Sequence, residues 1–399
     1  MAFGQLIDQR KQNKRNHVVD LFRENGALSK ARARQLSGYS MDTLITLFKT
    51  LEDEGYIEPV RDQGEEKAAA APAETRSKGR PAELYQLVPV KELYLGITFN
   101  QTGIWATLVG LDGRELVTSY AELPNLAEQT GFERFFRSHV AGFLDANRSR
   151  VPAIRQVALA LPGRIDAERG ILLRYPLMPC LADLDLVAPV RELVGDIPVS
   201  VQHNIAGFAA ALLRDPDARD LGRRILYVSA RSGTAHALIQ DGKLVIDDGE
   251  MGHLAVPCLD RSCQCGRTGC LDTIFSAAAF HELFPGQGWT EIAQAIARDD
   301  PQGRQYRERL EPSFQALVDV LLNLSAAFSP DALVLSGELF ACMPEAESWI
   351  AGHLRSRYGQ GKLPGWVPGT IRYLPGGVVG AAVGLCRSLM DMDWAWQAD

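Results

Sequence analysis

The 399-residue sequence lacks a run of about 18 apolar residues, the length that a membrane-spanning helix needs. Its polar start, MAFGQLIDQRKQNKRN, also lacks the apolar centre of a secretion signal. Cysteine is scarce, and four of the seven cysteines fall between Cys258 and Cys270. A small, clustered set argues against a disulfide framework and favours a reducing compartment. We therefore expect a cytoplasmic protein that does not insert into a membrane.

Net positive charge is also missing. The formal charge of −7 at pH 7 argues against binding nucleic acid over the whole surface. The charge is uneven, however, because residues 1–35 hold eight lysines and arginines against three acidic residues. A basic end on an acidic chain indicates a DNA-binding segment attached to a different body. A solvated charged face is the alternative.

The N-terminal segment has the spacing of three short helices followed by strands. Ser29 and Ser40 stand where N-caps are needed, and Gly26, Gly38 and Gly55 stand where helices or turns end. Helix, helix, turn, helix and strand is the order of a winged helix-turn-helix. The expected elements are helices 14–25, 30–36 and 41–54 and strands 56–60 and 83–87.

In a winged helix-turn-helix, the third helix enters the major groove with its N-terminal residues towards the bases. Residues 64–80 have no apolar periodicity and are interpreted as a mobile wing tip or linker. At its end, Arg80 could reach into a narrow minor groove, although a plain tether is the alternative. A three-helix protein-interaction module is the alternative for the whole segment. The predicted DNA contacts are Arg32, Ser40, Met41, Asp42, Thr43, Thr46, Lys49 and Arg80.

Metal ligands are concentrated between Asp248 and Asp272. Thiolates and imidazole at this spacing, with glycines turning the chain between them, suit a closed tetrahedral zinc site. Such a site has no open position for water, so we expect a structural Zn²⁺ rather than a catalytic one. Buried thiols beside a core histidine are the alternative, and Cys258 could compete as a ligand. The predicted ligands are His253, Cys263, Cys265 and Cys270.

This stretch resembles a known family. GEMGH at 249–253, followed by CxCGxxGCxD at 263–272, looks like the signature of the ROK family of repressors, uncharacterised frames and sugar kinases, in its sugar-responsive repressor branch. The family motif is written CxCGxxGCxE. The resemblance implies an α/β fold: a winged helix-turn-helix, then a two-lobed actin-like, ribonuclease-H-like body with a structural zinc knuckle. The expected parts are residues 1–90, a small lobe at 91–202 plus 380–399, and a large lobe at 203–379.

Strand patterns support this division. Three strands, a helix and a strand are expected from Leu93 to Leu161, and three further strands begin at Ile225. Each lobe of an actin-like sugar kinase begins in this way. We therefore expect two α/β lobes with a cleft between them.

The resemblance argues against catalysis. ROK kinases carry an Asn-Asp pair before a helix, where the aspartate takes the proton of the acceptor hydroxyl. Here the aspartate position is Asn204, whose amide cannot act as a base, and His203 beside it is a weak substitute. The stretches 96–100 and 231–236 match the family's two phosphate loops but lack most of their glycines. Phe99 would also crowd a nucleotide. We expect no kinase activity.

The positions that contact the sugar in the family are retained better than those of the phosphate loops. The resemblance places a sugar or polyol effector in the cleft, held by Gly163, Asn204, Glu250, His253 and Asp272. It implies a repressor of genes for carbohydrate metabolism or transport. An ATP-dependent sugar kinase with an added DNA-binding domain is the alternative, and a regulator without a small effector is a third possibility.

The resemblance also implies an operator-binding homodimer or homotetramer acting on double-stranded DNA. Family recognition helices often carry serine and arginine where this chain has Ile45 and Thr46. A guanine-reading arginine is therefore missing, and phosphate contacts are expected to supply much of the affinity.

Overall fold

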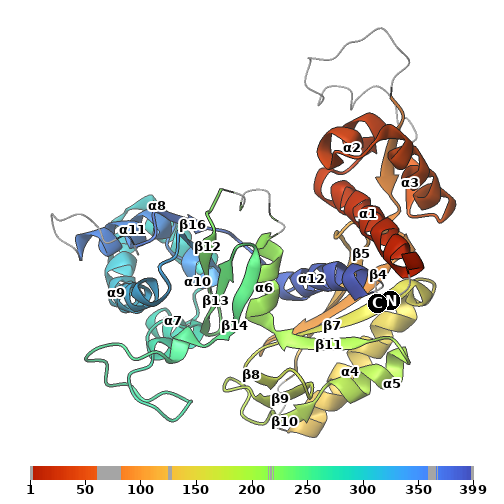
Figure 1. Ribbon diagram of the computed structural model, residues 1–399. Helices are drawn as coiled ribbons and strands as arrows, with labels where there is room; N and C mark the ends of the chain where they lie inside the picture. Colours follow the sequence, from red (N-terminus) through yellow and green to blue (C-terminus); the bar gives the residue numbers. More distant parts are fainter. Residues whose placement is uncertain are drawn as a thin grey trace.

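The structure is a computed structural model that describes residues 3–60, 82–124, 128–213, 215, 218, 220–357, 365 and 367–396. The predicted wing or linker at 64–80, with Arg80, lies outside the described residues. No described helix is long and apolar enough to cross a membrane. Figure 1 shows a helical N-terminal module above a body made of two α/β lobes.

The N-terminal module has three helices and a small antiparallel sheet of order β1-β3-β2. As expected, the Ser29 side chain accepts a hydrogen bond from the backbone N–H of Arg32, and Ser40 accepts one from Thr43. The first helix begins earlier than expected because its polar opening gives no apolar period. The elements are α1 (Phe3–Asn25), β1 (Leu28–Ser29), α2 (Lys30–Ser37), α3 (Met41–Asp53), β2 (Ile57–Pro59) and β3 (Leu84–Leu87).

The small lobe is built on a five-stranded sheet of order β11-β7-β4-β5-β6. Strands β4, β5 and β6 are antiparallel, whereas β7 and β11 run parallel to β4. Helices α4 and α5 pack on one face, and β8–β10 form a separate small sheet. The elements are β4 (Leu93–Phe99), β5 (Gly103–Gly110), β6 (Glu115–Glu122), α4 (Gln129–Ala146), β7 (Ile154–Leu161), β8 (Arg164–Asp166), β9 (Ile171–Arg174), β10 (Ala182–Asp185), α5 (Val187–Val194) and β11 (Val199–His203).

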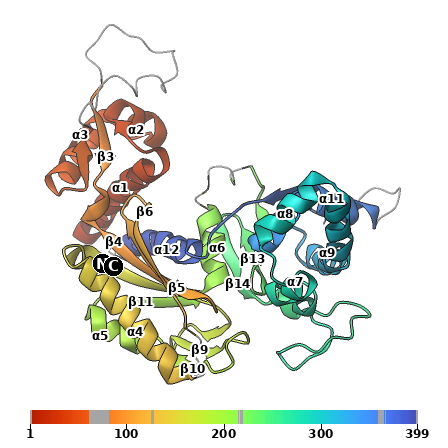
Figure 2. The same cartoon turned by 180° about the vertical axis from the view of Figure 1, so that it is seen from behind.

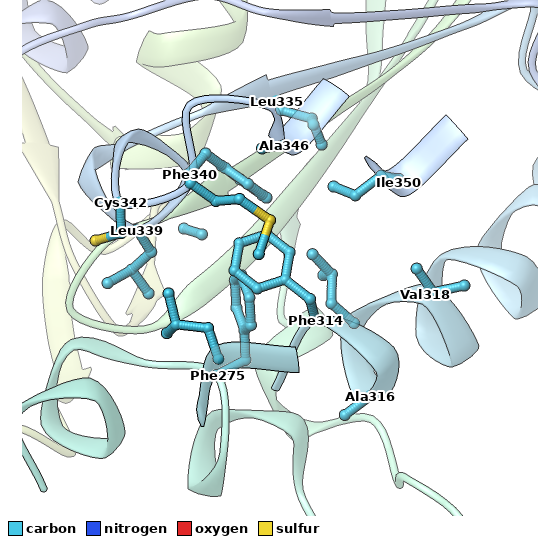
Figure 3. Close-up of a cluster of buried hydrophobic side chains, with 14 of the residues drawn as sticks. Phe275, Phe314, Ala316, Val318, Leu335, Leu339, Phe340, Cys342, Ala346 and Ile350 are labelled. Atoms are coloured by element: carbon cyan, nitrogen blue, oxygen red, sulfur yellow. The ribbon is translucent and has the colours of Figure 1, made fainter. Parts of the chain in front are cut away.

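The large lobe repeats this strand order as β14-β13-β12-β15-β16. Its core lies between the sheet and the helices of the lobe, where the rings of Phe275 and Phe314 meet edge to face at 5.1 Å, with Phe340 beside them (Figure 3). The elements are β12 (Arg224–Ala230), β13 (Thr234–Gln240), β14 (Lys243–Gly249), α7 (Ala277–Leu283), α8 (Trp289–Arg298), α9 (Pro301–Phe328), β15 (Ala332–Ser336), α10 (Glu338–Ala341), α11 (Ala346–Ser356) and β16 (Thr370–Tyr373).

Each lobe is followed in the sequence by a helix that packs on the sheet of the other lobe. Helix α6 (Asn204–Leu213) follows the last strand of the small lobe but packs on β13 and β14 of the large lobe. Helix α12 (Gly380–Trp396) follows the last strand of the large lobe but packs on β4 and β7. The two helices also contact each other, and both sheets and both helices share one apolar core.

The crossing of α6 and α12 is backbone to backbone. A Cβ atom at Gly207 would lie 2.1 Å from the carbonyl oxygen of Ala381, and one at Gly384 would lie 1.9 Å from that of Gly207. Real side chains do not fit at such distances, so glycine is required at both positions.

The N-terminal module rests on the small lobe. Leu111, in the turn between β5 and β6, is fully buried in the core of the module. The Tyr56 hydroxyl donates a 2.8 Å hydrogen bond to Glu92, whose carboxylate also lies 3.3 Å from Arg155 of β7. In both views, the start of α1 lies beside the end of α12 (Figures 1 and 2). The module is therefore joined to the body by buried contacts as well as by the chain.

Candidate functional site

The four predicted metal ligands come together in one loop, residues 250–272, which we call the metal loop. The ligand atoms of His253, Cys263, Cys265 and Cys270 all lie within 4.8 Å of one another. The Cys263 Sγ is 3.7 Å from the His253 Nδ1, and the Cys265 Sγ is 3.6 Å from the Cys270 Sγ. Tetrahedral zinc with Zn–S bonds of about 2.3 Å separates its sulfur ligands by about 3.8 Å. The donor set and its spacing fit a metal ion.

Local backbone geometry forms this loop. Gly266 and Gly269 adopt positive φ values of 93° and 80°, which favour glycine. An antiparallel bridge between Ala255 and Cys270 returns the chain towards the short 3₁₀ helix at Met251–His253. Cys258, the alternative ligand, is exposed and does not belong to the described group of ligand atoms.

A cavity of about 270 Å³ lies between the two lobes, beside this loop. Its wall comes from β4 and the β7–β8 turn of the small lobe, from the start of α6, and from the β12–β13 loop and metal loop of the large lobe. All five residues that the sequence analysis assigned to an effector line it. They are Gly163, Asn204, Glu250, His253 and Asp272.

The side of the cavity at α6 carries no base in the family's position. Asn204 begins α6, and the backbone N–H of Ile205 donates to the buried His203 Nδ1 at 3.2 Å. The His203 Nε2 lies 3.9 Å from the Glu250 carboxylate. Burial lowers the pKa of His203 to about 4, while nearby Asp248 acts in the opposite direction. The imidazole is therefore neutral at physiological pH.

Asp272 forms the floor of the cavity on the large-lobe side. Its Oδ1 accepts a 2.9 Å hydrogen bond from the backbone N–H of Thr234. Burial raises the pKa of this carboxyl to about 7. A Cβ atom at Gly252 or Gly233 would lie 2.2 Å or 2.8 Å from the carboxylate oxygens. These two glycines thus allow the loops to close tightly around Asp272.

Further contacts cross the cleft, and sequence reasoning missed them. Gln101 of the small lobe accepts hydrogen bonds at its Oε1 from Tyr175, at 3.0 Å, and from Ser232 of the large lobe, at 2.8 Å. The Arg174 guanidinium donates to the carbonyl oxygen of Gln264 in the metal loop at 3.5 Å. Isolated polar residues in loops give no periodic signal, so the sequence could not pair them.

Arg231 fills the loop that resembles a kinase phosphate loop. Its guanidinium lies 3.0 Å from the Glu338 carboxylate, donates to the carbonyl oxygen of Gly376 and stacks over the Phe208 ring at 4.6 Å. The side chain thus links the β12–β13 loop to α10, to α6 and to the segment before α12. Family glycines would leave this space open, whereas here a large cation occupies it.

Apart from Arg80, the predicted DNA contacts lie at the surface of the N-terminal module, with differing exposure. Arg32, Ser40, Asp42, Thr46 and Lys49 are exposed, and Met41 and Thr43 are partly buried. The Ser40 hydroxyl caps α3, so its side chain already has a structural use. Sequence reasoning left out Ile45, which is 48% exposed. Its position outside the apolar stripe of Leu44, Phe48 and Leu51 could have indicated from the sequence that it is exposed.

Comparisons with known proteins agree with this architecture. The chain is 24% identical over 351 residues to the DNA-binding transcriptional repressor Mlc of Escherichia coli K12, covering 84% of this chain and 82% of Mlc. A solved ROK family transcriptional regulator, a homolog of E. coli Mlc, has a TM-score of 0.72 at 18% identity and covers 98% of this chain and 99% of its own.

A kinase of known structure matches a smaller share of the chain. The ROK family glucokinase of Streptomyces griseus, in complex with glucose and AMPPNP, has a TM-score of 0.57 at 21% identity and covers 75% of this chain and 99% of its own. The regulator thus covers nearly the whole chain, whereas the kinase leaves about a quarter uncovered. The family model described as ROK family matches residues 94–353. With the metal loop, the repeated strand order and this match, the chain belongs to the ROK family.

Proposed function

We propose that this chain is a cytoplasmic, operator-binding transcriptional repressor whose DNA affinity responds to a carbohydrate. The observation that supports this most directly is the winged helix-turn-helix ahead of a ROK body, since the solved ROK family regulator matches 98% of this chain and the glucokinase matches 75%. Residues 1–90 would bind DNA. Residues 91–202 with 380–399, and residues 203–379, would form the two lobes that hold the effector.

The metal would be a structural Zn²⁺ held by His253, Cys263, Cys265 and Cys270. Three thiolates and one imidazole close a tetrahedral site, so the ion supplies rigidity and no open position for chemistry. Glu250 and His253 lie on one end of the metal loop and Asp272 on the other. Fixing the loop would therefore fix the three residues on the large-lobe side of the cavity.

The charge around the cavity favours an uncharged, hydroxyl-rich effector. Carboxyl groups of Glu250, Asp272 and Glu282 line it, while its two lining arginines are already paired, Arg231 with Glu338 and Arg261 with Glu282. A phosphate ester or nucleotide would meet acidic groups with no unpaired arginine among the described lining residues. Carboxylates and the Asn204 amide instead suit hydroxyl groups, which donate and accept.

We propose that the chain has no kinase activity. Asn204 cannot take a proton from an acceptor hydroxyl, and the Arg231 side chain occupies the loop that would approach a phosphate. ADP release across a panel of sugars tests this. Turnover by the native chain that disappears in Asn204→Ala would overturn it and favour a sugar kinase with an added DNA-binding domain.

Closure of the lobes around the effector would change the relative positions of two N-terminal modules in a homodimer or homotetramer. Two half-sites of a palindrome lie about 34–36 Å apart, so a change in module spacing lowers operator affinity. This assignment makes the carbohydrate an allosteric ligand rather than a substrate.

Selection of genomic DNA by the purified chain at near-physiological salt tests the proposal as a whole. We expect a few palindromic sites upstream of carbohydrate transport or catabolic genes, and release from them by a sugar that those genes process. Uniform recovery of fragments that weakens steeply with salt would mean phosphate-driven binding alone and would contradict a repressor.

A further inference from the structure

The exposed face of α3 lacks the side chains that read guanine and adenine most specifically. Arginine reads guanine best, and asparagine or glutamine reads adenine, yet α3 contains none of these three residue types. Its only cation, Lys49, lies more than two turns from the start of the helix. The exposed residues of its first three turns are Asp42, Ile45, Thr46, Lys49 and Thr50.

Both exposed threonines already use their hydroxyl hydrogens within the helix. The Thr46 Oγ1 donates to the carbonyl oxygen of Asp42 at 2.9 Å, and the Thr50 Oγ1 donates to that of Thr46 at 3.0 Å. Each hydroxyl therefore remains available only as a hydrogen-bond acceptor, and the methyl beside it is available for apolar contact. Beside them, the Ile45 side chain is 48% exposed, because it lies outside the buried apolar face of α3. The middle of the outer face is therefore aliphatic.

Only one base offers an aliphatic group in the major groove, because thymine alone carries a methyl at C5. We propose that α3 selects its half-site through thymine methyl groups, with Ile45 as the main contact and Thr46 beside it. This inference rests on the proposed DNA-binding function and deepens it. The expected operators therefore have half-sites that present thymine to the first turns of α3. Specificity would then depend on Ile45, a residue that makes no hydrogen bond to a base.

The test uses an operator duplex recovered by selecting random-sequence DNA with the full-length, metal-loaded protein. Each thymine is replaced in turn by deoxyuridine, which removes only the methyl and keeps base pairing. We expect one or two positions in each half-site where this change lowers affinity about threefold to tenfold, the range for losing one buried methyl contact. Replacements outside the half-sites should have no effect.

The variant Ile45→Ala tests whether Ile45 is the side chain that contacts the thymine methyl. It should bind the thymine duplex about threefold to tenfold more weakly and should no longer distinguish thymine from deoxyuridine at the sensitive position. Because Ile45 is exposed, its thermal unfolding should match that of the native chain. Val90→Ala is the matched control, since Val90 is 51% exposed in the 3₁₀ helix Pro89–Lys91, outside α3, and it should retain full discrimination. Lys49→Ala should weaken binding to both duplexes equally.

A selected operator that binds equally well with deoxyuridine at every half-site position would overturn the methyl-reading proposal and leave DNA binding intact. Equal discrimination by the native chain and by Ile45→Ala would also overturn the role of Ile45. Recovery of no enriched sequence at all would instead remove the proposed repressor function, and the methyl inference with it.

Discussion

The Arg23 Nε of α1 donates a 2.9 Å hydrogen bond to the carbonyl oxygen of Leu111, in the β5–β6 turn of the small lobe. Two residues further along this turn, the carbonyl oxygen of Gly113 accepts a 2.8 Å hydrogen bond from the Arg387 Nε of α12. One turn therefore holds both the first helix of the DNA-binding module and the helix that crosses between the lobes. This gives lobe movement a direct physical contact with the module.

We predict that Arg387→Met weakens the response to the effector. The change keeps an aliphatic stem but removes the bond between α12 and Gly113. The ratio of operator affinities without and with effector should fall at least about threefold, while affinity for the effector itself changes little. Fluorescence anisotropy of labelled operator, titrated with and without sugar, measures the ratio. Arg148→Met is the control, because Arg148 is exposed and pairs with Asp145 of its own segment, and equal ratios in both variants would contradict this coupling.

We predict about one zinc per chain and its loss in Cys265→Ser. Three remaining ligands cannot close the tetrahedron, so the loop that carries Glu250 and His253 should loosen and the thermal midpoint should fall by about 5 °C or more. Elemental analysis and thermal unfolding check the two effects. Cys258→Ser should retain zinc and stability because Cys258 lies outside the ligand group. Full zinc content in Cys265→Ser would refute this ligand set.

The buried His203 should make stability depend on pH. Its pKa is about 4 in the folded chain, against about 6.5 when unfolded. The unfolded chain therefore binds more protons in this range, and the free energy of unfolding falls as the pH drops below about 6.5. Between pH 7 and pH 5 the loss should be about 2 kcal/mol.

Denaturant titrations of the native chain and of His203→Gln, at pH 7 and pH 5, test this. Glutamine can accept the bond from the Ile205 N–H but does not titrate, so its loss of stability over this range should be smaller by about 2 kcal/mol. The ionisable groups of the metal loop titrate in both proteins, so their contribution to the free energy of unfolding cancels in the comparison. Parallel pH profiles would show that His203 is not the responsible group.

We predict that Gly384→Ala destabilises the chain by about 3 kcal/mol because its Cβ would overlap the Gly207 backbone at the α6–α12 crossing. Gly352→Ala is the matched control, since Gly352 also lies in a helix, α11, and a Cβ atom added there would meet nothing within 4 Å. That change should leave stability equal or raise it by up to about 1 kcal/mol. Chemical unfolding of both variants decides, and equal stabilities would argue against a tight crossing.

Local patterns explain how much of this fold the sequence reveals. Cap positions such as Ser29 and Ser40, and the apolar runs of strands such as Leu93–Phe99, depend on neighbouring residues, and the structure confirms them. The metal loop is equally local, because its three predicted cysteine ligands lie within eight residues.

Long-range relationships were not predictable in the same way. The short strand β1 was not expected, because two residues carry no period and form a strand only by pairing with β3. The packing of α6 against α12, and the contacts of Arg231 with Glu338 and Gly376, join segments more than 100 residues apart. The aliphatic outer face of α3 was readable from helical spacing, but its significance needed the threonine hydrogen bonds.

The glycine crossing of α6 and α12 makes α12 a lever. Because the two backbones are in contact there, with no side chain between them, the crossing could act as a pivot if the helices move relative to each other. From Gly384 to Trp396 the helix extends about 18 Å at 1.5 Å per residue. A rotation of about 10° would displace its far end, beside the start of α1, by about 3 Å, close to the rise of one base pair. A small rotation at the cleft would therefore move the start of α1 by about the rise of one base pair.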